Sequence, residues 1–227
     1  SVDGGTIKLD GNYPTGIHNV ALGNTAGNSI QSGGNYNTLV GDNAGTAITT
    51  GNSNVALGAN TLTTSTTATS NTAIGAAALQ LNTTGSHNTS TGYGALYSNT
   101  TASNNTANGY FALFANTTGT ENTAMGMSST AGNTTGNYNA AFGKGTLETN
   151  TTGSQNTALG ANVLQNATTA NANTGVGYYA LNANTTGVNN VAMGANSLDA
   201  NTTGVNNVGL GTNALSGNTT AEANTAI

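Results

Sequence analysis

The sequence predicts an all-β fold, a parallel β-solenoid of about twelve coils with 17 residues in each, on the strength of three observations. Asn recurs at a nearly constant interval, 18 residues for the first interval and 17 for the eleven that follow. Gly stands four residues after Asn in all twelve complete units, and Leu stands eight residues after it in nine of them. Such a unit is too short for a helical-hairpin repeat, and its Gly, Asn and adjacent Thr residues disfavour sustained helix. The recurring residues are Asn19, Asn37, Asn54, Asn71, Asn88, Asn105, Asn122, Asn139, Asn156, Asn173, Asn190, Asn207 and Asn224.

Each coil is numbered here from position 1, its Asn, to position 17. Positions 1 to 5, for example NTAIG at 71–75, are predicted to form a short strand that ends at Gly. Side chains at positions 2 and 4 then share one face, and position 3, almost always Ala, Gly or Ser, lies on the other. Gly at position 5 predicts a positive φ or a close approach between coils. The next stretch places Leu inward at position 9 and forms a second strand or a single helical turn, before Asn-Thr-Thr-Gly turns the chain back.

Stacked coils bring equivalent residues together in ladders along the axis of the solenoid. At ~4.8 Å per coil, twelve coils give a rod of roughly 58 Å. Asn at position 1 either forms a ladder of side-chain amides or faces outward in a turn, and the sequence favours neither alternative. The residues of the expected structural ladder include Asn71, Gly75, Asn88, Gly92, Asn105, Gly109, Asn122, Gly126, Asn139, Gly143, Asn156 and Gly160.

The two ends of the sequence differ from the repeat. Residues 1–18 break the pattern and are expected to be an N-terminal cap or connector, with the repeat solenoid at 19–227. The sequence opens at Ser1 rather than Met, which suggests a processed chain or a fragment, and it stops four residues into a new coil. Because an open strand edge invites further pairing, we expect either a longer natural chain or end-to-end docking of subunits.

Self-association is expected from the small number of large apolar residues. Each coil offers about two of them for burial, which is little against the conformational entropy that its residues lose on folding. Contact with further copies of the chain would bury more surface, and the small residues at position 3 are the expected contact. We therefore predict a homotrimer or an end-to-end filament.

The repeat resembles known fibrous proteins. NTAIG at 71–75, NTALG at 156–160 and NVAMG at 190–194 resemble the strand motif of trimeric autotransporter adhesin heads. Those heads are left-handed parallel β-rolls in which three chains pack side by side. The longer unit, NTALG with a following Leu and then NTTG, is similar to repeats of phage tail-fibre and bacterial surface-fibre proteins, over residues 19–227. The resemblance implies a left-handed coil, a homotrimer, and a location outside the cell, on its surface or on a virion, although the constant period, the Leu and the NTTG turn depart from the adhesin pattern.

Composition excludes several classes of function. Charged residues make up 4% of the chain, and it has neither Cys nor Arg. This argues against disulfide scaffolds, thiol-bound zinc and basic nucleic-acid binders, and no apolar run approaches the ~20 residues of a membrane helix. The two His residues, His18 and His87, are expected to be exposed in loops, and the scattered acidic residues do not predict a calcium site. We expect no enzymatic activity, no catalytic or metal-binding residues, no cofactor, no nucleic-acid partner and no membrane insertion.

Asn-x-Thr sequences recur at nearly regular spacing, which a requirement of the turn explains more simply than glycosylation. They begin at Asn82, Asn99, Asn116, Asn133, Asn150, Asn166, Asn184, Asn201 and Asn218.

Two functions fit these features. The first and favoured one is a structural fibre, a rod in a tail fibre, an adhesin stalk or a surface filament, with attachment to a host or surface. The alternative is ice binding by stacked Thr ladders, such as Thr185–Thr186, Thr202–Thr203 and Thr219–Thr220. Adjacent Thr residues on an extended strand point to opposite faces, so only one Thr per coil is expected on any flat array.

One place interrupts the repeat. The apolar series at position 4 is replaced by Thr91 and Asn108 in adjacent coils. The favoured interpretation is compensation, in which nearby aromatic rings fill core volume lost at position 4. The other is an exposed patch that stacks on the sugar faces of host-surface glycans. The candidate glycan-binding residues, all in these two coils, are Tyr93, Tyr97, Tyr110, Phe111 and Phe114.

Overall fold

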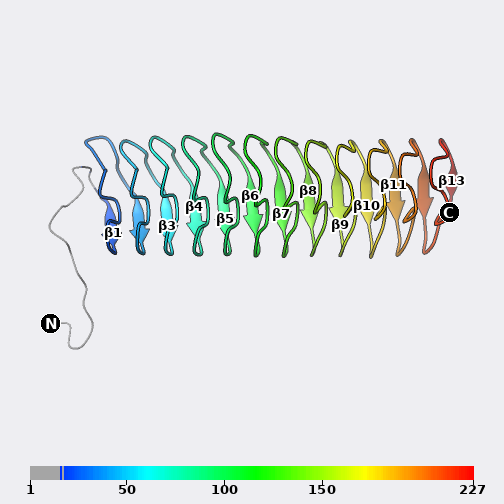
Figure 1. Ribbon diagram of the computed structural model, residues 1–227, viewed down its shortest axis with the longest axis horizontal. Helices are drawn as coiled ribbons and strands as arrows, with labels where there is room; N and C mark the ends of the chain where they lie inside the picture. The colour runs from blue at the N-terminus through cyan, green and yellow to red at the C-terminus, as the bar shows by residue number, and fades with distance from the viewer. Residues whose placement is uncertain (1–15, 17) are drawn as a thin grey trace, which may run out of the picture.

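The computed structural model describes residue 16 and residues 18–227, and these form a single rod of stacked coils (Figure 1). One short strand begins each coil, and this part of the chain contains no helix. The predicted cap or connector at 1–18 lies outside the described residues except for Gly16 and His18. The strands are β1 (Val20–Leu22), β2 (Thr38–Val40), β3 (Val55–Leu57), β4 (Thr72–Ile74), β5 (Thr89–Thr91), β6 (Thr106–Asn108), β7 (Thr123–Met125), β8 (Ala140–Phe142), β9 (Thr157–Leu159), β10 (Thr174–Val176), β11 (Val191–Met193), β12 (Val208–Leu210) and β13 (Thr225–Ala226).

All thirteen strands belong to one parallel sheet in chain order, in which β2 to β12 each pair with two neighbours and β1 and β13 with one. The register carries no shift, so equivalent residues face each other from coil to coil; Thr72 pairs with Thr89 and Ala73 with Ser90. The predicted parallel β-solenoid with 17-residue coils is therefore confirmed.

Gly at position 5 closes each strand as predicted. Gly126 has a φ of +136°, which L side chains rarely adopt. A Cβ at Gly126 would lie 2.5 Å from the carbonyl oxygen of Gly143 in the next coil. Both expected reasons for the glycine, a positive φ and a close approach between coils, are present.

The stretch after this glycine is neither a second strand nor a helical turn, which corrects both expectations. It is a series of turns in which positions 7 and 9 have positive φ, for example 59° at Ala77 and 50° at Leu79. Such values are costly for residues other than Gly. Backbone hydrogen bonds to the neighbouring coils stabilise these positive φ values. Ala77 N donates to Ala59 O at 3.0 Å, and Leu79 N donates to Ala95 O at 3.0 Å.

The interior of each coil is narrow, and in most coils it holds one large apolar side chain; the coil at 37–53 holds two, Leu39 and Ile48, and the coil at 122–138 holds none. Leu79 at position 9 is fully buried, as predicted, together with the small residues Ala73 at position 3 and Ala78 at position 8. Position 3 therefore faces the protein's own core, and the expectation that it contacts another chain is wrong. The expectation of two large buried apolar residues per coil is also wrong, because position 4 points outward; Ile74 is exposed.

The Asn residues at position 1 form a buried amide ladder, which decides between the two alternatives. Asn71 Nδ2 donates to Asn54 Oδ1 at 3.2 Å and to Gly85 O at 2.9 Å. Asn71 Oδ1 accepts from the backbone N of Asn88 at 2.9 Å and from its Nδ2 at 3.2 Å. Every polar atom of this buried side chain is thus paired, as a buried amide requires.

A second buried amide ladder runs along position 12, where the sequence indicated only a turn. Asn99 Nδ2 donates to Asn82 Oδ1 at 2.8 Å and to Ala102 O at 3.0 Å. This ladder is interrupted after Asn150, because the next coil has Ala167 at position 12. Asn150 Oδ1 is consequently buried without a hydrogen-bond partner.

The apolar core is divided into two clusters at the middle of the rod. One cluster extends as far as Ala124 on β7 and the other begins at Ala141 on β8. Buried hydroxyl residues lie between them, where Ser129 Oγ and Thr146 Oγ1 are 2.8 Å apart. Thr130 occupies position 9 in place of Leu, and its buried hydroxyl has no hydrogen-bond partner.

Candidate binding surfaces

The outer sheet face, defined as the side chains at positions 2 and 4 of every coil, is the most extended apolar surface of the described residues. Position 4 supplies its large side chains, of which Leu57 is 47% exposed, Leu159 50% and Met193 46%. Position 2 is Thr, Val or Ala throughout, and no charged residue occupies either position in the described coils. An exposed apolar strip of this length indicates an interaction surface rather than ordinary solvent-facing surface.

Thr91 and Asn108 interrupt the outer sheet face at adjacent strands. Both lie at position 4, and Asn108 is exposed. Because position 4 does not contribute to the core, there is no lost core volume for aromatic rings to fill. The compensation interpretation is therefore wrong.

The five candidate glycan-binding residues form one continuous aromatic cluster on the surface of the β5 and β6 coils. Tyr93 and Tyr110 stack at a centroid distance of 5.7 Å, and Tyr97 and Phe114 stack at 5.1 Å. Phe111 joins the two pairs, 4.1 Å from the Tyr110 ring and 4.6 Å from the Phe114 ring. Tyr93 and Tyr110 are 53% and 50% exposed, whereas the other three are half-buried.

The stacking of the aromatic rings along the rod determines which parts of each ring a ligand can contact. Near-parallel rings separated by about one coil spacing face each other along the rod, so each pair presents its edges and two outer faces to solvent. The patch hypothesis requires Tyr97 and Tyr110 to be exposed side by side. Tyr110 is exposed, but Tyr97 is half-buried and its ring pairs with Phe114. Tyr93 and Tyr110 are the pair best placed to meet a ligand.

The two adjacent Thr residues of each coil have different environments. At position 13 the hydroxyl donates to the backbone of the next coil; Thr83 Oγ1, for example, lies 2.9 Å from Thr100 O. Position 14 is exposed in every coil that has this Thr, from Thr50 to Thr220. One exposed Thr column therefore runs along the rod, as the adjacency of the pair predicted.

Burial of the Asn side chain determines which of the Asn-x-Thr sequences are accessible to glycosylation. Those whose Asn lies at position 12, such as Asn82 and Asn133, have a fully buried amide that belongs to the second ladder, except Asn218 in the last complete coil, which is half-buried. A turn and ladder requirement explains their regular spacing, and buried amides are inaccessible to modification. Asn166, displaced to position 11, is exposed.

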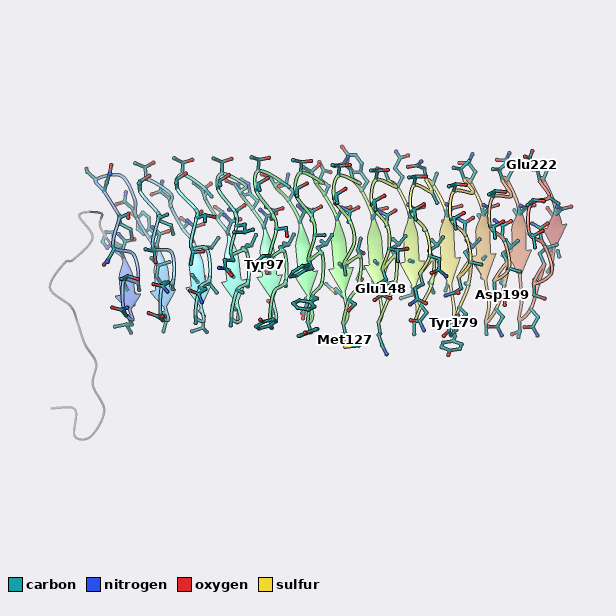
Figure 2. All side chains as sticks on the ribbon, in the orientation of Figure 1. Tyr97, Met127, Glu148, Tyr179, Asp199 and Glu222 are labelled. Atoms are coloured by element: carbon teal, nitrogen blue, oxygen red, sulfur yellow. The ribbon has the colours of Figure 1, made fainter. Side chains whose placement is uncertain are left out.

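The acidic residues of the described chain are scattered along the rod and do not gather at one place. Tyr97, Glu148 and Asp199 share position 10 and follow one line, whereas Met127 and Tyr179 project from the edge where the strands end (Figure 2). Glu148 accepts a hydrogen bond from Gln165 Nε2 at 2.7 Å. Hydrogen bonding with Tyr179 raises the pKa of the Tyr178 phenol. His18 and His87 are exposed, as expected.

Across residues 18–227, no group of three or more His, Asp or Glu side chains gathers as a metal site would require. The same residues include no helix that is long and apolar enough to cross a membrane. The absence of catalysis, cofactors and nucleic-acid binding stays a prediction from composition.

Comparison with known proteins gives no family. No family model matches the chain, and neither a curated protein nor a solved structure matches it. The resemblance to adhesin heads and fibre repeats thus remains an expectation from the repeat motif.

Proposed function

We propose that this protein is a structural fibre protein, a rigid rod in a tail fibre, an adhesin stalk or a surface filament. The observation that carries the proposal is the unshifted register of the sheet along the whole rod. Each coil contacts only its neighbours, so length is set by the number of coils. Two buried amide ladders join the coils and resist bending. The proposed location is extracellular, on a cell surface or on a virion.

The proposal includes self-association, as a homotrimer or an end-to-end filament, and attachment to host-surface glycans through the aromatic cluster. Tyr93 and Tyr110 support the second part because their rings are 53% and 50% exposed and stack side by side. Rings of this kind stack against apolar faces of ligands.

Electron microscopy of in-register deletions tests the rod. Removing residues 122–138 takes out one whole coil and should leave a straight rod shorter by ~4.8 Å. Removing eight residues, 122–129, puts unlike positions against each other and should abolish the cooperative melting transition. If the protein tolerated both deletions equally, its fold would not depend on the 17-residue register, and this would contradict a rod whose length is set by the number of coils.

Ice binding is the second candidate, favoured by the exposed Thr column at position 14. Its regular methyl and hydroxyl groups repeat at the coil spacing of ~4.8 Å. Thermal hysteresis of the purified protein is the test. Activity that disappears when Thr101, Thr118 and Thr135 are changed to Asn would support ice binding, and a complete lack of hysteresis would exclude it.

A further inference from the structure

The outer sheet face has the size of a protein interface. It is roughly 58 Å long at the spacing of parallel strands, and about 10 Å wide from position 2 to position 4 with side chains included. These dimensions give on the order of 600 Å², at the lower end of the area per partner in stable complexes. Exposed side chains at position 6, such as Tyr93, Tyr110 and Met127, widen the strip in the middle.

The side chains of the outer sheet face restrict which partner can pack against it. It presents columns of Thr, Val and larger apolar side chains with no charge, so it neither repels an identical copy nor attracts a charged partner. Its features repeat at the coil spacing along the full length of the rod. A second copy of this chain offers the matching repeat, length and lack of charge.

We infer that the outer sheet face packs against the same face of a second copy, parallel and in register, and that Thr91 and Asn108 fix this register. The inference rests on the proposed fibre function and gives its lateral contact as a pair of rods in place of the homotrimer, because two identical faces that cover each other leave no place for a third copy. It also moves the self-association contact from position 3 to positions 2 and 4.

Register needs a specific device because a repeating apolar face can slide. A shift by one coil exchanges Ile74 for Leu57 and changes the apolar contact little. At Thr91 and Asn108 the same shift matters, because it places the Asn108 amide against Met125 of the other copy. A polar group buried against apolar atoms loses its hydrogen bonds to water without replacement. When the two-fold axis between parallel copies runs along the column of position-4 side chains, each of them lies opposite its own counterpart. In register, Asn108 then meets Asn108, and each amide both donates and accepts.

Orientation follows from the same two residues. An antiparallel arrangement can also bring Thr91 opposite Asn108, and it then places β4 opposite β7 and β1 opposite β10. Among the described coils, this leaves Met193 on β11 uncovered. The parallel arrangement covers every coil of the described rod. A single buried Asn fixes register in coiled coils by the same physics.

Disulfide crosslinking tests orientation and register, because the chain has no native Cys. A disulfide joins Cβ atoms about 3.8 Å apart, so it distinguishes one coil from the next. Ile74→Cys and Met125→Cys should each form covalent dimers with themselves on oxidation. Thr84→Cys, exposed at position 14, is the control and should not. Crosslinks between tagged Ile74→Cys and untagged Met125→Cys copies would show antiparallel packing and overturn the inference.

The register residues are tested by a double variant, Thr91→Val with Asn108→Leu. In this background, crosslinks between Ile74→Cys and Leu57→Cys copies should rise several-fold, because slipped pairings are no longer disfavoured. An unchanged crosslinking pattern would show that Thr91 and Asn108 do not fix the register.

Sedimentation and electron microscopy separate this inference from the fibre proposal. Leu57→Asn with Leu159→Asn should reduce the mass to that of a monomer while single rods keep their length. Thr84→Asn with Thr152→Asn, both exposed at position 14, is the matched control and should leave the mass unchanged. Wild-type rods that are monomeric at micromolar concentration would overturn the lateral contact and leave the rod intact. The loss of rods in the wild type would overturn both.

Discussion

Asn71 and Asn82 donate to the same acceptor, the carbonyl oxygen of Gly85, each from Nδ2 at 2.9 Å. The two amide ladders therefore meet at position 15 of each coil. This junction ties the strand to the return segment across an interior that has one large apolar side chain. Hydrogen bonds between amides, more than apolar area, hold the coils closed.

The ladder at position 1 should be sensitive to a single truncation. Asn88→Ala removes the Nδ2 donor to Asn71 Oδ1 and to Ala102 O, each of which keeps one other donor. It also takes away the acceptor of the backbone N–H of Asn105, which is buried. A buried polar group left unpaired costs about 1–3 kcal/mol, so the free energy of unfolding should fall by about that amount. Urea denaturation measures it. Asn166→Ala, at an exposed site, is the control, and an equal effect of both would contradict the ladder's role.

The gap in the second ladder should be repairable. Ala167→Asn places a donor beside the unpaired Asn150 Oδ1 and should raise the free energy of unfolding by about 1–3 kcal/mol. The matched control is Ala167→Asp, which has the same shape but cannot donate when ionised and should destabilise the rod. If Asp stabilised as much as Asn, hydrogen bonding would not be the cause.

The polar interior at the middle of the rod predicts a stabilising substitution. Thr130→Leu restores the side chain found at position 9 in nine coils and removes a buried, unpaired hydroxyl. We expect a gain of about 1–3 kcal/mol and a higher melting temperature by circular dichroism. Thr130→Val removes the hydroxyl alone and should gain less. A destabilised Leu variant would show that the neighbouring hydroxyl residues need the smaller side chain.

Gly126 should not tolerate a side chain. Gly126→Val combines a β-branched residue at φ +136° with a Cβ 2.5 Å from Gly143 O, and should cost about 3 kcal/mol or more. Gly217→Val is the control, because nothing lies within 4 Å of its added Cβ. Thermal melting of the two variants compares them, and similar melting temperatures would contradict the close approach between coils.

Attachment through the aromatic cluster predicts loss of binding without loss of fold. Tyr93→Ala with Tyr110→Ala should abolish retention on immobilised host glycans, while the melting temperature falls only slightly because both rings are about half exposed. The control is Tyr178→Ala, equally exposed but outside the cluster. Binding that survives the double variant would remove the glycan proposal.

Much of the fold was predictable because the repeat fixes the period, the strand and the glycine that closes it. The inward side of the strand was not predicted correctly, although a signal was present. Position 3 accepts mainly Ala, Ser and Gly, as a narrow interior demands, whereas position 4 accepts Leu, Met, Phe, Thr and Asn, as a surface permits. Variation in side-chain volume was the better guide to burial than hydrophobicity.

The turns after the strand were missed because Leu rarely adopts positive φ. The signal for them lies in a few coils, where Gly27 and Gly45 occupy position 9 and Gly94 and Gly145 occupy position 7. The aromatic cluster was predicted from the repeat, because its five residues lie in the two adjacent coils where the apolar series at position 4 is interrupted. Its stacking along the rod could not be found that way, because it depends on which positions face outward.

The two amide ladders also give the rod an electrical direction. In both, the Nδ2 groups point to the preceding coil and the Oδ1 groups to the following one, as in Asn54 to Asn37 and Asn99 to Asn82. The backbone opposes this direction, because more N–H groups in the coil that begins at Asn71 donate to the following coil than to the preceding one, and the Thr hydroxyls at position 13 do the same. Aligned amide dipoles add along an axis, as they do in a helix. The side-chain amides of the ladders therefore make the two ends of the rod chemically different, because Oδ1 acceptors face one end and Nδ2 donors face the other.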